Sequence, residues 1–393
     1  MSQDWTEYLK NPFRLAWQPE VPLSDRMIYR LLDPPLTRYW IGFWLTLTNQ
    51  PAPLQDWNWS QGWEANLQAG AFPPPTSLFV ARLGMTLLLP ISLLSIYALG
   101  YALRGRRVAW TSLFLAGGHA LILLHTRRAM AEGLLLSGST LTLWLLSLPA
   151  PNPWLLGLSA ALAFNAKYTA LPLVGLGVLR LGLLDQTKPT YTPKARLGAI
   201  LAFLSAFTLL TLALNPFLWK HPVEALKQAA AARQHLITAQ VGDFKVANPL
   251  MVAESTSTRL RNMLLQVFFA PPQLSEAANY NQALATSYNS YEHNPFHSLL
   301  RGKTGGGLIL ALTLLGMLAL TLDRREALPS SRLSTQVLIL GTIFQSGFFL
   351  GWLPLSFQRY YILLVPYVVL WTAMGIDSLL KALNLLLDQI WRK

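Results

Sequence analysis

Seven stretches of the chain are apolar for about the 20 residues that a helix needs to cross a bilayer. They are residues 76–103, 108–124, 132–148, 195–215, 306–322, 333–353 and 360–380. An eighth apolar stretch, 154–184, is interrupted at Asn165, Lys167 and Tyr168 by groups that are costly in lipid. That stretch is either one tilted span or two short helices. The pattern therefore predicts an all-α polytopic membrane protein.

Lysine and arginine decide between one span and two, because positive residues in short loops stay on the cytoplasmic side. If 154–184 turns at Lys167, thirteen basic residues gather on one side of the membrane and four on the other. The thirteen are Arg104, Arg106, Arg107, Arg180, Lys188, Lys194, Arg196, Arg324, Arg325, Arg332, Lys381, Arg392 and Lys393, and the four are Arg127, Arg128, Lys167 and Arg359. A single span scrambles the later loops. We therefore predict about nine passes, two of them short, with a cytoplasmic C-terminus.

This topology divides the chain into four parts. Residues 1–75 form an extracytoplasmic N-terminal segment with an interfacial helix, and 76–215 form a transmembrane core that includes the short helix pair. Residues 216–305 form a large extracytoplasmic loop, which is long enough to be exempt from the charge rule. Residues 306–393 supply the last transmembrane helices and a cytoplasmic tail. An upstream first helix would explain how 1–75 reaches the outside, and translocation of the tail by the first span is the alternative.

Composition narrows the class of protein further. Of 393 residues, 52% are hydrophobic and only 12% are charged, against about 25% charged in soluble domains. The absence of cysteine from the sequence excludes disulfides, cysteine-ligated metal centres and thiol nucleophiles. The net charge of +13 is interpreted as topology and contact with anionic membrane lipid, with no nucleic acid as partner.

Polar groups at membrane depth collect in three turns on the predicted outer face. The turns carry His125, Arg127, Arg128 and Glu132; Lys167 and Tyr168; and Arg359, Tyr360 and Tyr361. Four cations facing outward need an anionic ligand or internal partners, and a phosphate suits the planar fork of arginine and the point charge of lysine. The alternative is that the arginines only snorkel to lipid headgroups. Glu132 is either a carboxylate favoured at a helix N-terminus or an acid that holds an acceptor hydroxyl, a metal or a cation.

The N-terminal segment adds further carboxylates. Asp33-Pro34-Pro35 breaks the chain before YWIGFW, a run that suits an interfacial helix but is too short to span. Asp25 and Asp33 are thus held at the outer surface, either as general bases or as ordinary turn and cap residues. There is no P-loop, H-E-x-x-H or G-x-S-x-G motif. The histidine spacing predicts no histidine-built metal site.

Five segments in order resemble motifs of the GT-C class of glycosyltransferases, the group with the protein O-mannosyltransferases and the aminoarabinose lipid A transferases. They are DPPLTRYWIG at 33–42, HTRRAMAEGLLL at 125–136, AFNAKYTALPLV around Lys167, LALNPFLWKHP at 212–222 and FQRYYILLVP around Arg359. The resemblance covers nearly the whole chain. It implies inverting transfer of a hexosyl or pentosyl group from a polyprenyl-phosphate-linked donor to an acceptor on the extracytoplasmic face.

The resemblance also implies roles for residues. Lys167, Arg127, Arg128 and Arg359 would hold the donor phosphate, Glu132 would lie near the acceptor, and Tyr168, Tyr360 and His125 would contact substrate. The first acidic motif of the family is absent as such, so the base is either on a missing upstream segment or a nearby carboxylate, namely Glu20, Asp25 or Asp33. The acceptor is a lipid, glycan or protein, the need for a divalent metal is open, and a prokaryotic inner membrane suits the short loops of this cell-envelope enzyme.

Two other classes compete with the enzyme. One is a transporter or lipid flippase for an anionic substrate, and the other is a non-catalytic assembly subunit. Clustering of the polar groups on one face and the long outer loop favour the enzyme. On that hypothesis Lys167→Ala and Arg359→Ala each abolish transfer and leave the protein folded.

Overall fold

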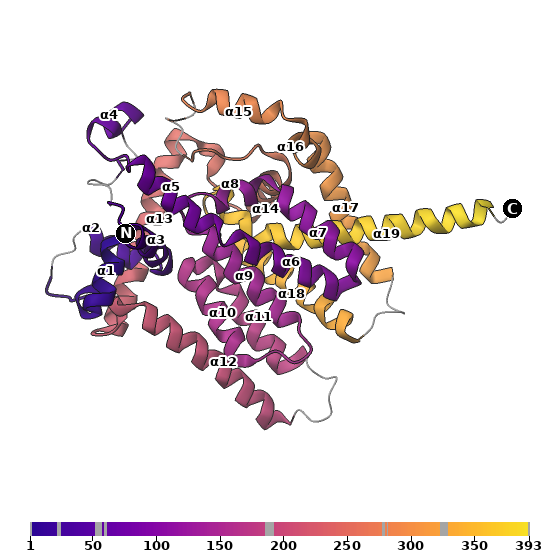
Figure 1. Cartoon of the computed structure of the whole chain (residues 1–393), viewed down its shortest axis with the longest axis horizontal. Helices are drawn as coiled ribbons and strands as arrows, with labels where there is room; N and C mark the ends of the chain where they lie inside the picture. Colours follow the sequence, from indigo (N-terminus) through magenta and orange to yellow (C-terminus); the bar gives the residue numbers. More distant parts are fainter. Residues whose placement is uncertain are drawn as a thin grey trace.

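The structure, a computed structural model, describes residues 2–21, 25–51, 57–58, 61–184, 192–276, 280, 282–322 and 329–391. Within these ranges the chain is helical, and the only extended pairing is an isolated bridge between Val252 and Leu355. The helices pack into one elongated bundle, and the last helix projects from it toward the C-terminus (Figure 1).

The helices fall into three groups along the chain. The N-terminal group is α1 Ser2–Lys10, α2 Asp25–Leu32, α3 Leu36–Leu47 and α4 Trp63–Gln68. The central group is α5 Pro75–Thr86, α6 Leu89–Arg104, α7 Arg106–Gly118, α8 Ala120–Thr126, α9 Glu132–Ser147, α10 Pro153–Ala166, α11 Pro172–Leu179 and α12 Pro193–Leu214. The C-terminal group is α13 Pro222–Ala247, α14 Thr256–Leu264, α15 Ala285–Glu292, α16 Pro295–Leu300, α17 Gly302–Leu322, α18 Pro329–Trp352 and α19 Val365–Trp391. Short 3-10 helices, η2 Tyr168–Ala170 and η8 Gln358–Leu364, and the π-helical turns η3 Arg180–Leu184 and η6 Leu265–Phe269 connect them.

By length and composition, five helices in the described part of the chain qualify as membrane spans, or six if one bent pair counts as a span. They are Pro75–Arg104, Pro193–Leu214, Gly302–Ala319, Ser331–Trp352 and Gln358–Trp391, and the bent pair is α7 with α8. The all-α membrane fold is thus confirmed, but the count of nine passes is not. The stretch 108–124 is no single straight span, because the chain bends by 58° between Gly118 and Ala120. The helix expected at 132–148 has 16 residues, fewer than the roughly 20 that span a bilayer.

The expected pair of short helices between 154 and 184 is present. Asn152 opens α10 by accepting hydrogen bonds from the backbone N–H groups of Trp154 and Leu155 at 2.9 and 3.3 Å, a typical N-cap. The helix ends at Ala166, one residue before Lys167, and the chain turns through η2 into α11. Lysine and the following polar groups therefore end the helix where the sequence pattern places the turn.

The two ends of α9 define the two ends of this part of the bundle. Lys167 lies at the first residue of α9, Glu132, with Nζ 2.8 Å from Oε1. Arg180, which is fully buried, donates from Nε to the carbonyl oxygen of Leu146 at 3.0 Å and from Nη2 to that of Leu148 at 2.9 Å, at the opposite end. The helices α10 and α11 therefore run out and back along α9, over a distance of about 24 Å for 16 residues. Arg104 is the last residue of α6, and Arg107 lies in the first turn of α7. Both pair with Asp377, at 3.8 and 3.5 Å.

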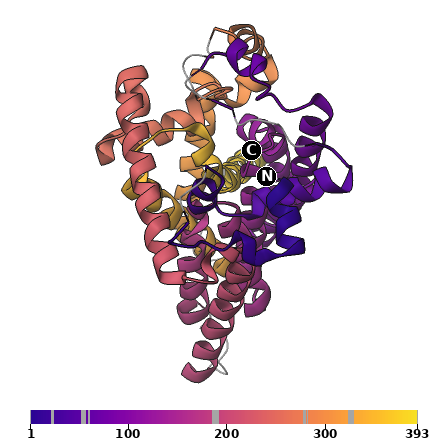
Figure 2. The same cartoon turned by 90° about the vertical axis from the view of Figure 1, so that its left-hand side faces the viewer.

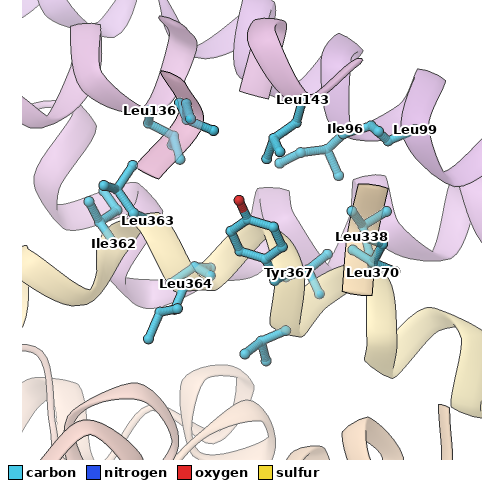
Figure 3. Close-up of a cluster of buried hydrophobic side chains, with 14 of the residues drawn as sticks. Ile96, Leu99, Leu136, Leu143, Leu338, Ile362, Leu363, Leu364, Tyr367 and Leu370 are labelled. Carbon is cyan, nitrogen blue, oxygen red and sulfur yellow. The ribbon is translucent and has the colours of Figure 1, made fainter. Parts of the chain in front are cut away.

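The main core lies where α6, α9, α18 and α19 meet. Tyr367 stands at the centre of this cluster, surrounded by Leu136, Leu143, Ile96 and Leu338 (Figure 3). The apolar stretch NMLLQVFF contributes Val267 and Phe268 to this core through η6. The long helix α13 runs along one flank (Figure 2). These contacts hold the helices in place, and the polar groups of the predicted outer turns lie at the ends of these helices.

Close packing of α17 on α19 depends on two glycines. A Cβ added at Gly316 would collide with the carbonyl oxygen of Trp371, and one added at Gly375 would collide with that of Leu312. The hydroxyl groups of Thr313 and Thr372 hydrogen-bond across the same contact at 2.9 Å. Small residues that let backbones approach in this way are typical of membrane helix pairs.

We expect Gly316→Ala to destabilise the protein by about 1–3 kcal/mol, because backbone atoms cannot move aside for the new methyl group. Gly307→Ala on the same helix is the matched control, since nothing lies within 4 Å of a Cβ built there. Thermal unfolding of both variants in detergent measures the difference. Equal melting temperatures would show that α17 and α19 do not pack as closely as described.

The N-terminal segment is fastened by a buried ion cluster that the sequence reading did not single out. Asp4 on α1 accepts from Arg30 Nη2 at 2.6 Å and lies 3.2 Å from Arg38 Nε, and the side chains of all three are about 10% exposed. Burial opposes ionisation of Asp4, but the hydrogen bond from Arg30 and the charges of Arg30 and Arg38 outweigh it and hold the pKa of Asp4 below its usual value. The cluster joins α1, α2 and α3 into one unit, with α3 as the helix expected around YWIGFW.

We expect Asp4→Asn to lower the free energy of unfolding by about 3 kcal/mol, because it leaves two buried arginines without their carboxylate. Glu7→Gln is the control, since Glu7 also contacts Arg30 at 3.2 Å but is 34% exposed, and exposed pairs contribute less than about 1 kcal/mol. Because the folded-state pKa of Asp4 is lowered, its contribution is complete above the ordinary aspartate pKa of about 3.9 and is lost as pH falls through the lower folded value. Melting temperatures measured against pH should therefore converge for the wild type and Asp4→Asn only at strongly acidic pH, and a constant difference would contradict the assignment.

Candidate functional site

Glu132 and Lys167 form a buried ion pair at the start of α9. Glu132 is the first residue of that helix and is 1% exposed, whereas Lys167 follows the last residue of α10. Their side chains meet at 2.8 Å, and the Lys167 side chain remains 19% exposed. Both interpretations of Glu132 are therefore compatible with its position, since a helix N-terminus and a lysine each favour the carboxylate.

Arg359 joins this pair through an aromatic ring. Lys167 Nζ lies 4.6 Å from the centroid of the Tyr360 ring, and Arg359 Cζ lies 5.6 Å from the same centroid. Cations at such distances are attracted to the ring. The 3-10 helix η8 carries both Arg359 and Tyr360. It therefore places Arg359 beside the Tyr360 ring, and the same ring faces Lys167.

The third cation, Arg128, comes from the turn between α8 and α9. Its Nη2 donates to the carbonyl oxygens of Leu274 and Gln273, in the outer segment that follows η6. Arg128, Glu132, Glu276 and Arg359 all act on one another electrostatically. We call Arg128, Lys167 and Arg359, with the Tyr360 ring, the cation cluster.

The outer segment 271–276 lies against this cluster and adds a second carboxylate to it. Glu276 Oε1 is 2.9 Å from Arg359 Nε. Burial raises the pKa of Glu276 above its usual value, with a smaller contribution from Glu132, although Arg359, Lys167 and Arg128 act to lower it. With three cations and two carboxylates the formal charge is 3 − 2 = +1.

His125 lies at the edge of the cluster with unsatisfied polar atoms. It is 1% exposed, and neither ring nitrogen has a hydrogen-bond partner among the described residues. The second oxygen of Glu132, Oε2, is likewise buried without a hydrogen bond there. Glu132, Arg128, Lys167 and Arg359 are the charged groups that act on His125. Buried polar atoms of this kind call for a bound water or ligand atom.

The structure thus brings together six of the residues singled out from the sequence, namely His125, Arg128, Glu132, Lys167, Arg359 and Tyr360. Arg127 is exposed, and no ion pair joins it to a described residue. Its side chain therefore lies outside the cation cluster, in contrast to its neighbour Arg128. Tyr168 packs on Phe164 with ring centroids 5.0 Å apart and is not part of the cluster's contacts.

The carboxylates considered as bases lie apart from the cation cluster. Asp33 is exposed and pairs with Arg233 at 3.5 Å, and Glu20 is exposed without an ion pair to a described residue. Asp25 begins α2, but its side chain lies outside the described part of the structure.

Sequence reasoning missed Glu276 and Gln358. The side-chain oxygen of Gln358, Oε1, accepts a hydrogen bond from the backbone N–H of Gln273 at 2.6 Å. The backbone N–H of Gln358 donates to Gln273 Oε1 at 3.0 Å. These two bonds attach the segment that contains Gln273 to η8. Glu276 falls in the Tyr/Asn-rich stretch that reads equally as a sugar-binding surface or a solvated loop. A lone carboxylate in such a stretch carries no spacing signal, and only the fold reveals its partner.

Two further features were checked against a ligand role. No group of three or more His, Asp or Glu side chains in the described ranges is arranged to hold a metal ion. A hollow of about 450 Å³ is lined by residues of α1 and the end of α3, among them Gln3, Lys10 and Asn49, and by none of the cation cluster.

Comparison with solved structures finds the oligosaccharyltransferase AglB of Archaeoglobus fulgidus. Its complex with an inhibitory peptide and a dolichol-phosphate has a TM-score of 0.46 and 12% identity, over 98% of this chain and 51% of that chain. The apo form gives 0.47 and 12% over 98% and 51%, and a complex with Zn and sulfate gives 0.46 and 13% over 98% and 49%.

This chain spans about half the length of these neighbours. No family model and no curated protein matches it. The neighbours are described as oligosaccharyltransferases. With TM-scores below 0.5, the likeness is one of general arrangement, and the function has to be inferred from the side chains of this chain.

Proposed function

We propose that the chain is a membrane glycosyltransferase that moves a sugar from a polyprenyl-phosphate-linked donor to an acceptor on the extracytoplasmic face. The observation that carries this proposal is the cation cluster, in which Arg128, Lys167 and Arg359 converge at one end of apolar helices. A phosphate attached to a lipid would have its chain among such helices and its charge at their ends.

The cluster supplies what departure of a phosphate requires. When the bond from the anomeric carbon to the phosphate oxygen breaks, negative charge grows on the phosphate, and fixed cations stabilise it. Glu132 holds Lys167, and Lys167 and Arg359 both lie against the Tyr360 ring. The two cations are therefore already positioned, and the site needs little reorganisation when the phosphate leaves. Because Lys167 is only partly exposed, its charge is screened less by water than that of a surface lysine.

Inverting transfer also needs a carboxylate to accept the proton of the acceptor hydroxyl. Among the described side chains we propose Asp33 for this role, an exposed carboxylate of the N-terminal segment that pairs with Arg233 of α13 at 3.5 Å. The acceptor would then bind between α2 and the turn at Lys167. Glu20 and Asp25 are the other carboxylates proposed for this role, and Glu132 would act on the acceptor only through Lys167.

A transfer assay in proteoliposomes tests the proposal. The purified chain is reconstituted with radiolabelled polyprenyl-phosphate sugars and a mixture of lipid, glycan and peptide acceptors. Label in an acceptor supports the enzyme. Translocation of a fluorescent prenyl phosphate across the bilayer without any transfer would contradict it and favour a flippase, and neither activity with any donor would favour an assembly subunit.

A further inference from the structure

The outer segment 271–276 holds the cation cluster by contacts of the kind that a phosphate would make. Arg128 donates to the carbonyl oxygens of Gln273 and Leu274, and Arg359 Nε is 2.9 Å from the Glu276 carboxylate. Carbonyl and carboxylate oxygens of this segment therefore lie against two of the three cations. Lys167 has its partner, Glu132, on α9 instead.

Several polar contacts attach this segment to its surroundings. Arg128 and the Gln358 side chain donate to its backbone carbonyl oxygens, Gln273 and Gln358 exchange hydrogen bonds, and the Leu274 N–H donates to the Tyr288 hydroxyl at 2.9 Å. The Glu276–Arg359 pair is one further attachment. The Arg359 and Glu276 side chains remain 24% and 19% exposed, so this pair is open to water in a way that Glu132 is not. An ion pair with such access is exchanged for another anion more readily than a fully buried one.

The charge balance points the same way. With Glu276 in place the cluster carries a formal charge of +1, and without it the charge is 3 − 1 = +2. The phosphate of a prenyl-phosphate-linked sugar is a diester with one negative charge, whereas the prenyl monophosphate released by transfer carries about −1.5 to −2 near pH 7, like other phosphate monoesters. Exchange of the Glu276 carboxylate for the diester therefore keeps the net charge of the site at 2 − 1 = +1.

Resting on the proposed function, we propose that Glu276 is a carboxylate stand-in for the phosphate of the lipid donor, displaced from Arg359 when the donor binds. Displacement frees the segment 271–276 from one of its attachments, so donor binding and release of this segment from the cluster are coupled. Glu276 thereby sets the affinity for the donor and selects anions that bind Arg359 more strongly than a carboxylate does.

The test compares Glu276→Gln with the wild type, both as full chains in lipid nanodiscs, by measuring the Kd for farnesyl phosphate. We expect a Kd about three- to tenfold lower in the variant, because the neutral amide no longer competes for Arg359. Glu254→Gln is the matched control, since Glu254 is an exposed outer-loop carboxylate that pairs with Lys245 at 2.7 Å. Its Kd should equal that of the wild type.

A second measurement follows the segment directly. The sequence has no cysteine, so Ser275→Cys introduces a single thiol whose labelling by a water-soluble maleimide should become faster when farnesyl phosphate is added. Equal or weaker binding by Glu276→Gln, or a labelling rate that farnesyl phosphate leaves unchanged, would overturn the stand-in. Loss of transfer at unchanged Kd would also overturn it and would make Glu276 a catalytic group. If the wild type and Glu254→Gln both fail to bind farnesyl phosphate, the proposed function fails and this inference fails with it.

Discussion

Lys167→Ala is expected to abolish sugar transfer and, at the same time, to weaken the folded protein. Lys167 is the partner of Glu132, which is 1% exposed, so its removal leaves a buried carboxylate without a cation. Breaking a buried pair in this way costs about 3–5 kcal/mol. The sequence alone predicts loss of transfer with the fold unaffected, and the second half of that prediction is revised by the contact with Glu132.

The double variant Lys167→Met with Glu132→Gln separates the two effects. Removing both charges should restore most of the stability, because no unpaired ion remains. It should not restore transfer, because the phosphate loses a cation. Lys245→Ala is the control, since Lys245 forms an exposed pair with Glu254 and should change stability by less than about 1 kcal/mol. Melting temperature and transfer rate are measured on each variant, and normal transfer by the double variant would remove Lys167 from the phosphate site.

Arg359→Ala is expected to lose donor binding almost completely while the fold survives. Arg359 pairs with Glu276, which is 19% exposed, so its carboxylate can turn to water when the arginine is absent. Loss of a charged hydrogen-bonded partner costs about 2–5 kcal/mol of binding, or about 30- to several-thousand-fold in Kd. Arg359→Lys should recover part of this, since the charge remains but the planar fork does not.

The Kd for farnesyl phosphate in nanodiscs measures both variants. Arg261→Ala is the control, because Arg261 is an exposed arginine on α14 whose contact is the side chain of Asn262 at 3.5 Å. It should bind as the wild type does. If Arg359→Ala and Arg261→Ala bind equally well, the anion site lies elsewhere and the proposed role of η8 is wrong.

The parts of the fold that follow from local chemistry were predictable from the sequence. A lysine inside an apolar run is costly in lipid, and together with the distribution of basic residues this indicated the turn at Lys167. The apolar stretches likewise indicated most of the long helices, including α12, α17, α18 and α19. The bend between α7 and α8 also has a local signal, because Gly117, Gly118 and His119 interrupt the apolar stretch there, but the prediction of a straight span at 108–124 passed over it.

The parts of the site that depend on long-range packing were not predictable. Glu276 reaches Arg359 across 83 positions of sequence (359 − 276), and Asp4 reaches Arg30 and Arg38 from a separate helix. Nothing in the spacing of these residues distinguishes them from other surface charges. Arg127 and Arg128 are adjacent and chemically identical, yet the turn exposes one and directs the other to Leu274. Only the fold separates them.

The most direct test of the central claim is an experimental structure of the full chain with a prenyl phosphate bound. The account predicts that the phosphate lies within hydrogen-bond distance of Arg359 and Lys167, with the lipid chain among the apolar helices and the Glu276 carboxylate withdrawn from Arg359. A phosphate bound elsewhere, with the Glu276–Arg359 and Glu132–Lys167 pairs intact, would contradict it.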